Sequence, residues 1–331
     1  MNRIAGVLAL VVGLYGWLYL SNPAQFNLYV VVDLLNRHGF FGILSLGVGV
    51  LIITGGIDLS IGSVVALSAV SFGVLMRQGV PPIVAASIVI TGGIVIGLIH
   101  GLLVTWGGLQ PFLVTLCGLF VYRGLARTVS GIGEKTAEQT VSLYTIRNAA
   151  PESAGAMDWL RAVFVGKGSD GGLTIPMEFL WMLGLAAALA VILHGSAYGR
   201  YWYAIGYNEQ AARYSGVNVT RHRIIVFVIS SLGAAAGGII LLLDFASVDP
   251  ASDGGEFELL AITGAVIGGC SLRGGEGTVL GIFLGSAILP AINKLNIFLG
   301  VPNTVIPIVI GLTLLIGAGL DEWLRRRSSR N

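Results

Sequence analysis

One acidic side chain lies inside the most apolar part of the chain. Asp58 belongs to GGIDLSIGS at Gly55–Ser63, between apolar runs over Phe40–Ile53 and Ile61–Met76. A charge at bilayer depth costs about 3 kcal/mol on insertion scales and is retained where it faces protein or a water-filled path. Glycine-rich breaks in membrane helices expose backbone polar groups to a transported solute. The stretch therefore predicts a helix break beside a transport path, with candidate residues Gly55, Gly56, Asp58, Ser60, Gly62 and Ser63.

Two roles are open for Asp58. Its carboxylate can cap the helix expected to begin near Leu59, where the helix dipole stabilises negative charge, or it can bond hydroxyl groups of a solute. His100 lies on the apolar run Ile83–Trp106. It fits either an interior histidine bonded by its neighbours or, with Asp58, a proton or sodium path. The second reading corresponds to a secondary transporter driven by an ion gradient.

Other chemistry finds little support in the sequence. Cys117 and Cys270 both lie in apolar surroundings, and the four histidines are scattered without metal-ligand spacing. The glycine-rich run Gly166–Gly172 does not match a phosphate-binding loop, and no ATPase motif occurs elsewhere. There is no cluster of nucleophile, base and metal ligand. We expect no enzyme activity, no metal and no cofactor in this chain.

Composition places these groups in a membrane. Of 331 residues, 55% are hydrophobic and 11% are charged, and the mean hydropathy is +0.85. Soluble domains carry about 25% charged residues. The net charge of +2 gives no indication of nucleic-acid binding. The chain is predicted to be an all-α polytopic membrane protein that forms a single transmembrane domain over residues 1–331.

The apolar runs predict about ten helical segments, of which about eight to ten cross fully. Runs beside Gly55–Ser63 and Gly268–Thr278 are short for a crossing of about 20 residues, so broken helices are expected there. Leu28–His38 is expected to be an interfacial lead-in to the second run. The ten runs are Ile4–Leu20, Phe40–Ile53, Ile61–Met76, Ile83–Trp106, Phe112–Val129, Glu178–His194, Ile224–Leu243, Leu259–Gly269, Val279–Ile292 and Thr304–Leu320.

Charge distribution gives an orientation. The stretch from Tyr198 to Arg223 is the most basic internal segment, and basic loops stay in the cytoplasm. Arginines close the chain after Leu320, whereas the loop from Asp244 to Glu258 is acidic. Both termini are therefore expected in the cytoplasm. The polar segment 130–177 is expected to be an extracytoplasmic loop with a short amphipathic helix over Met157–Val165.

The basic segment 198–223 contains a predicted short helix, Glu209–Tyr214, with Asn208 as N-cap and Gly216 as C-cap. An alanine pair gives this helix a flat face that suits docking into a groove of a partner protein. An ordinary linker between membrane helices is the other reading. The candidate residues of this loop are Gly206, Asn208, Ala211, Ala212, Ser215 and Gly216.

The chain contains three motifs in this order: GGIDLSIGS at Gly55–Ser63, GYNEQAARYSGVNV at Gly206–Val219 and GGCSLRGGEGTVLG at Gly268–Gly281. The third partly echoes the first, which suggests an internal duplication. Together, over Asn36–Leu320, they resemble the permease subunits of bacterial ATP-binding cassette (ABC) importers for ribose, xylose, arabinose and galactofuranose. Departures are a longer, more charged loop over Ser130–Pro176 and the residues Cys270 and Arg273.

The resemblance implies a multi-pass subunit of the bacterial inner membrane that forms half of a sugar path. A second permease, identical or a sister chain, would complete the path within the lipid. Cytosolic ATP-binding subunits would hydrolyse ATP and act on segment 198–223, and an external binding protein would deliver a monosaccharide. An ABC permease for amino acids or nucleosides remains an alternative on the sequence.

Overall fold

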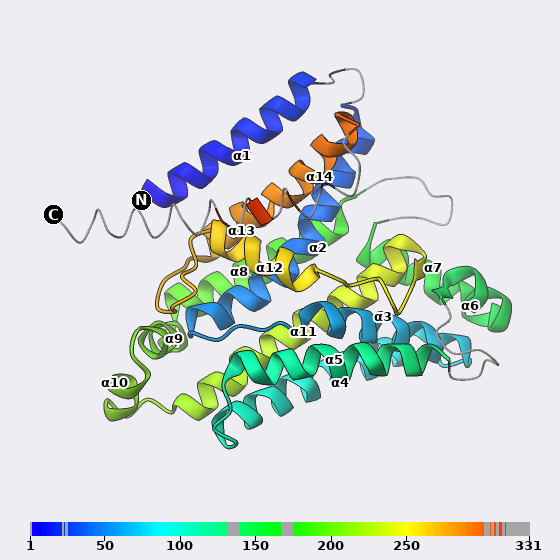
Figure 1. The fold of residues 1–331 in the computed structure, drawn as a ribbon. Coiled ribbons are helices and arrows are strands. Elements are labelled where there is room, and N and C mark those ends of the chain that lie inside the picture. The colour runs from blue at the N-terminus through cyan, green and yellow to red at the C-terminus, as the bar shows by residue number, and fades with distance from the viewer. Residues whose placement is uncertain are drawn as a thin grey trace.

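The computed structural model describes residues 2–21, 23, 26–131, 140–166 and 175–300, and isolated positions beyond 300. These residues are mostly helical (Figure 1). The predicted span Thr304–Leu320 falls almost wholly outside them, as do the C-terminal arginines. The longer helices are α1 (Asn2–Ser21), α2 (Leu28–Ile53), α3 (Ile61–Arg77), α4 (Pro82–Thr105), α5 (Pro111–Ser130), α8 (Met177–Gly195) and α11 (Val219–Phe245).

The remaining elements are short. They are β1 (Val141–Ser142), α6 (Leu143–Ala149), a 3₁₀ turn (Pro151–Ser153), α7 (Ala154–Phe164), α9 (Ala197–Tyr207), α10 (Glu209–Tyr214), β2 (Ser247–Val248), α12 (Phe257–Ile267), α13 (Val279–Ser286) and α14 (Ile288–Phe298). Within the described residues, seven helical stretches are long and apolar enough to cross a membrane, with α13 and α14 counted as one stretch. The helices α3 and α12 are apolar but shorter. The expected loop after Ile292 is instead helical as far as Phe298.

Helices α2 and α11 form the centre of the bundle. Helix α11 packs against α2, α3 and α4, and α2 also packs against α8, α12 and α13. Almost every residue in the second half of α2 is buried, whereas α1 lies along α13 and α14 at the edge (Figure 1). Helices α2 and α11 therefore form the buried interior of the bundle, and α1 lies at its surface.

The expected lead-in Leu28–His38 is wrong, because these residues form the first part of α2, a helix of 26 residues. Its polar side chains, which suggested an interface, have distant partners. The Asn36 amide donates to the Val165 carbonyl at 3.2 Å, and the His38 ring lies 2.9 Å from the Phe283 carbonyl. Buried polar groups with partners are tolerated inside a bundle, so the helix continues through them.

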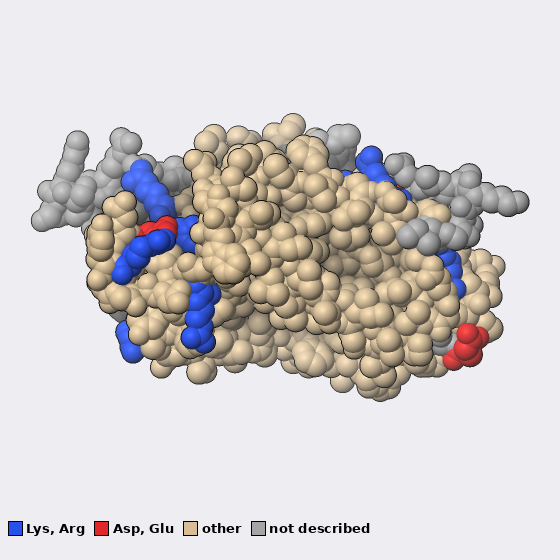
Figure 2. All heavy atoms as spheres, turned by 90° about the horizontal axis from the view of Figure 1, so that it is seen from below, with Lys and Arg blue, Asp and Glu red and all other residues tan. Residues whose placement is uncertain are grey.

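The outer surface of the bundle is that of a membrane protein. Large apolar side chains are exposed along α1, α4, α5 and α8. Figure 2 shows lysine, arginine and acidic residues gathered toward the two ends, with an uncharged belt between them. A broad apolar surface of this kind is costly in water but is matched to lipid. The prediction of an α-helical polytopic membrane protein is confirmed.

Three glycines allow α4 and α11 to approach closely. A β-carbon on Gly93, Gly97 or Gly101 would lie 2.5 to 2.7 Å from atoms of α11. Their spacing of four residues puts them on one face, as in close membrane helix pairs. Gly92, beside them in the sequence, has open space around it and takes no part in this contact.

The two ends of the bundle differ in structure. Helices α9 and α10 lie at one end, toward which the N-terminal end of α1 also points, and α6 and α7 lie at the other (Figure 1). At the α6–α7 end, β1 pairs with β2 in antiparallel register, and the Arg161 guanidinium donates to the Leu243 carbonyl at 2.9 Å. These bonds attach segment 140–166 to the end of α11. The predicted helix Met157–Val165 corresponds to α7, whereas α6 and α9 were not predicted.

Candidate functional site

The break after α2 is built by two adjacent glycines. Gly55 has a φ of +81°, which glycine adopts at no steric cost. Its N–H donates to the Ile52 carbonyl at 2.8 Å, and the Gly56 N–H donates to the Leu51 carbonyl at 3.0 Å. This pair of bonds is the Schellman arrangement that ends helices. The chain therefore leaves α2 sharply and runs as a coil to Ser60.

Asp58 lies at the centre of this coil and is 1% exposed. Its Oδ1 accepts from the Ser60 N–H at 2.9 Å and from the Ser60 hydroxyl at 2.6 Å. Its Oδ2 accepts from the Ser230 hydroxyl of α11 at 2.8 Å. His100 lies within electrostatic range, and its Nε2 is 3.0 Å from the Tyr122 hydroxyl. The carboxylate thus joins the coil to α11 through neutral donors.

Helix α3 begins at Ile61, two residues later than expected, and Ser60 is its N-cap residue. Asp58 therefore forms a turn with Ser60 and does not cap the helix directly. Ser63, in the first turn, donates to the Ser60 carbonyl at 2.7 Å. From α5, the Thr115 hydroxyl lies 3.1 Å from the Ile57 carbonyl oxygen and 3.0 Å from the Pro111 carbonyl oxygen of its own helix, and it shares its one hydrogen between them.

The first turns of the two short helices meet inside the bundle. A β-carbon on Gly62 of α3 would overlap both the Gly254 carbonyl oxygen, just before α12, and the Glu258 carboxylate in the first turn of α12. Glu258 Oε2 is buried, with no hydrogen-bond partner among the described residues. Helix N-termini carry partial positive charge, and transporters often bring two of them together at mid-membrane.

The glycine-rich segment 268–278, predicted as a second break, is non-helical and lies beside the end of α2. The Gly275 N–H donates to the Ile53 carbonyl at 2.8 Å. A β-carbon on Gly206, near the end of α9, would overlap both this carbonyl oxygen and the Gly275 nitrogen. The Tyr203 hydroxyl of α9 donates to the Gly277 carbonyl at 2.7 Å. All three sequence motifs therefore meet at one junction.

The Tyr203 hydroxyl is well suited to hold this junction. Burial, followed by the influence of Cys270, raises the pKa of Tyr203 to about 12. A tyrosine phenol is protonated near neutral pH even at its ordinary pKa, and burial extends this range upward, so Tyr203 keeps the hydrogen that it donates to Gly277. Sequence reasoning missed this residue because α9 was taken as part of a loop.

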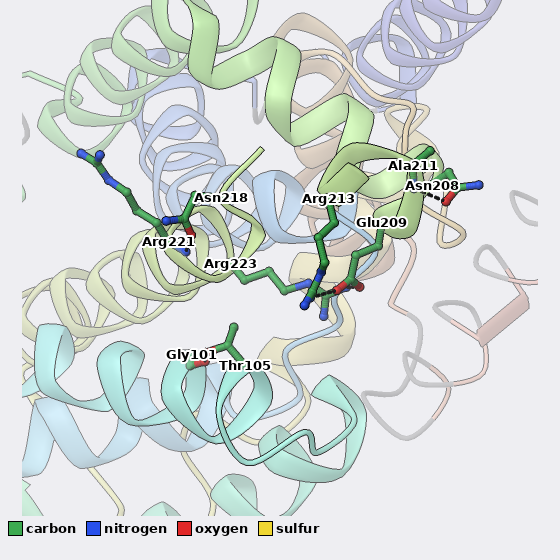
Figure 3. A network of polar contacts seen from close by, with 9 residues as sticks. All are labelled: Gly101, Thr105, Asn208, Glu209, Ala211, Arg213, Asn218, Arg221 and Arg223. Carbon is green, nitrogen blue, oxygen red and sulfur yellow. Dashed lines mark hydrogen bonds and ion pairs between the residues drawn. The ribbon is translucent and has the colours of Figure 1, made fainter. Parts of the chain in front are cut away.

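The short helix α10 has the predicted bounds, Glu209–Tyr214. Asn208 Oδ1 accepts from the Ala211 N–H at 3.0 Å (Figure 3). Gly216 has a φ of +84° and follows the helix end at Ser215. The Ser215 hydroxyl donates back to the Ala211 carbonyl at 2.9 Å. Both predicted caps are confirmed.

The expected docking face needs a correction. Ala212 is 5% exposed and packs with Ile205 and Val219, so only Ala211 of the pair faces outward. On either side of α10, Tyr207 is 87% exposed and Tyr214 is 90% exposed. Large exposed aromatics are typical of protein interfaces. The sequence alone could not show which side of this short helix was free.

Glu209 connects α10 to the start of α11. Its carboxylate receives the Arg213 guanidinium at 3.0 Å and the Arg223 guanidinium at 2.6 Å, as Figure 3 shows. Arg213 lies one turn along the same helix, whereas Arg223 belongs to α11. At the same end, the Arg221 guanidinium donates to the Tyr198 hydroxyl at 3.2 Å.

These features define a multi-pass transport protein of the cell membrane with a broken-helix interior. The chain belongs to the family described as the permease component of branched-chain amino acid transport systems, which matches residues 30–318.

Relatives in this family carry more specific names. The chain is 33% identical to the ribose import permease protein of Bacillus subtilis, over 91% of this chain and 87% of the relative. It is 31% identical to the ribose import permease of Escherichia coli K12, over 91% and 88%. It is 27% identical to an autoinducer 2 import permease of Yersinia enterocolitica, over 98% and 95%. No solved structure matches the chain. The resemblance to permeases of sugar importers is confirmed.

Proposed function

We propose that this chain is the membrane subunit of an ATP-driven importer of a monosaccharide, set in the bacterial inner membrane. The observation that carries the proposal is its similarity to ribose import permeases over 91% of its length. This similarity does not favour a transporter driven by an ion gradient. The His100 ring is also hydrogen-bonded to the Tyr122 hydroxyl, which favours a structural interior histidine over a proton relay.

The sugar path is proposed to run past the coil Gly55–Ser63 and the first turns of α3 and α12. Backbone N–H groups at the two helix starts can bond sugar hydroxyls. The buried Glu258 oxygen adds an acceptor beside Gly62. Asp58 has a positioning role in this proposal, because its oxygens already receive bonds from Ser60 and Ser230.

The remaining parts of the importer are proposed to meet this chain at its two ends. ATP hydrolysis occurs on separate cytosolic subunits, which dock on α10 through Tyr207, Ala211 and Tyr214. An external binding protein delivers the sugar at the opposite end, near α6 and α7. A second permease, identical or a sister chain, completes the path. Closure of the ATP-binding subunits moves α10 and turns the path outward, and nucleotide release returns it inward.

Substrate uptake tests the proposal directly. The chain is expressed with the ATP-binding and solute-binding proteins encoded beside it, and uptake of labelled ribose, xylose, arabinose and leucine is compared. We expect uptake of one pentose, lost when this chain is deleted. Uptake of leucine alone would move the substrate to the class named in the family description.

The energy source is tested separately. An uncoupler is added while cellular ATP is held constant, and uptake is measured again. An ATP-driven importer keeps its uptake, whereas ATP depletion stops it. Loss of uptake with the uncoupler alone would refute the proposal.

A further inference from the structure

We propose that α10 is attached to the break at Gly55–Ser63 through two separate contacts, and that both are needed for ATP-driven movement of α10 to reach the sugar path. The inference rests on the proposed docking of ATP-binding subunits on α10. It adds which residues of this chain transmit the movement.

The first attachment runs through α9. A single residue, Asn208, separates α9 from α10, so the two short helices are directly joined. Near the end of α9, Gly206 presses against the Ile53 carbonyl and the Gly275 nitrogen without space for a side chain. The Tyr203 hydroxyl, one turn earlier, holds the Gly277 carbonyl at 2.7 Å. Movement of α9 must therefore displace the end of α2 and segment 268–278 together.

The second attachment runs through α11. Glu209 of α10 pairs with Arg223 of α11 at 2.6 Å, and the Arg223 side chain is 17% exposed. Ser230, on the same helix, donates to Asp58 at 2.8 Å. Seven residues of α-helix span about 10 Å, and α11 is unbroken between these positions. A displacement at Arg223 therefore reaches the Asp58 carboxylate through one rigid element.

The two attachments hold different parts of the same coil. The α9 contact acts where α2 ends, at Ile53, whereas the α11 contact acts on Asp58, just before α3 begins. When both hold, the coil moves as a unit with α10. When one is lost, α10 moves one side of the coil and leaves the other in place. The expected result is ATP hydrolysis without proportionate transport.

The test measures sugar uptake per ATP hydrolysed by the complete importer in liposomes. The variant Arg223→Gln removes the ion pair to α10, and Ser230→Ala removes the bond to Asp58. The matched control is Arg221→Gln, which removes the same charge from the same turn of α11, gives up the Arg221 bond to the Tyr198 hydroxyl and leaves the Glu209–Arg223 pair intact. Binding of the ATP-binding subunits is measured for each variant by co-purification.

We expect Arg223→Gln and Ser230→Ala to bind the ATP-binding subunits and to hydrolyse ATP at near wild-type rates. Uptake per ATP should fall about tenfold, within the usual range of coupling between sites. Arg221→Gln should keep its uptake ratio. The exchange of both charges, Glu209→Arg with Arg223→Glu, should restore most of the coupling lost in Arg223→Gln.

An unchanged uptake ratio in Arg223→Gln would overturn the inference, as would an equal loss in Arg221→Gln. Loss of co-purification in Arg223→Gln, not restored by the charge exchange, would also overturn it, because the pair would then serve docking. Failure of the wild-type chain to bind any ATP-binding subunit would instead refute the proposed function. The two failures are therefore distinguishable.

Discussion

The two glycine-rich breaks share a sequence pattern but are held in different ways. Gly55–Ser63 is fixed by side chains from two other helices, because Ser230 and Thr115 both bond to it. Segment 268–278 is held at two backbone groups, because its Gly275 N–H donates to the Ile53 carbonyl and its Gly277 carbonyl accepts from the Tyr203 hydroxyl. Its Leu272 side chain is 47% exposed. The first break is thus held through the carboxylate of Asp58, whereas the second is held at backbone groups of its glycines.

Removal of the Asp58 carboxylate, which belongs to the first break, should lower the stability most. Asp58→Ala leaves the Ser60 and Ser230 donors without their acceptor, at a cost of about 3 kcal/mol. Thermal unfolding of the detergent-purified protein should reveal this loss. Asp58→Asn keeps an acceptor oxygen and should lose less. Full sugar uptake in Asp58→Asn would show that the charge itself is not required.

A side chain at Gly275 should disturb the second break. Gly275 has a φ of +78°, and a β-carbon there would lie 3.0 Å from the Tyr207 nitrogen. We expect Gly275→Ala to cost about 2 kcal/mol through left-handed backbone strain and crowding. The control Gly269→Ala carries similar strain, with a φ of +96°, but meets no neighbouring atom.

Thiol labelling provides the measurement. Cys270 is buried and Cys117 is exposed, so a Cys117→Ser background leaves the buried thiol as the reporter. Labelling of Cys270 by a maleimide dye should be faster in Gly275→Ala than in Gly269→Ala. Equal rates in the two variants would mean that crowding between a side chain at position 275 and Tyr207 does not open the segment.

Thr115→Val should weaken the first break to a smaller extent. It removes the hydroxyl bond to the Ile57 carbonyl, worth about 1 kcal/mol. Thr128→Val on the same helix is the control, since its exposed hydroxyl donates to the Gly124 carbonyl four residues earlier, as the Thr115 hydroxyl also does to the Pro111 carbonyl. The difference in unfolding temperature between the two variants isolates the bond to the break. A larger loss in Thr128→Val would contradict the comparison.

The smallest effect is expected from Leu272→Ala. This side chain is exposed in the second break, and surface substitutions usually change stability by less than about 0.5 kcal/mol. Unfolding temperature and Cys270 labelling should both stay near wild type. A marked loss of sugar uptake at unchanged stability would show that Leu272 meets a partner protein.

Local signals allowed α10 to be predicted to the residue. Its caps, Asn208 and Gly216, act within one turn of the chain, so the sequence contains the whole explanation. The start of α2 has a local cap too, since Asn27 accepts from the Val30 N–H. Its first turns were nevertheless taken for an interfacial segment, because the partners of Asn36 and His38 lie 129 and 245 positions away. The Ser230 partner of Asp58 is 172 positions distant. Contacts of that range depend on packing that no local pattern encodes.

Helix α11 has a further consequence for how the two faces of the membrane communicate. Its 27 residues begin beside Arg223 at the α10 end and finish at the carbonyl of Leu243, which Arg161 of α7 holds. One continuous helix therefore joins segment 140–166 at one end of the bundle to α10 at the other. Free-energy coupling between two sites is reciprocal. If ATP-binding subunits dock on α10 as proposed, a protein that binds segment 140–166 more tightly when they hold nucleotide must in turn tighten their nucleotide binding by the same factor.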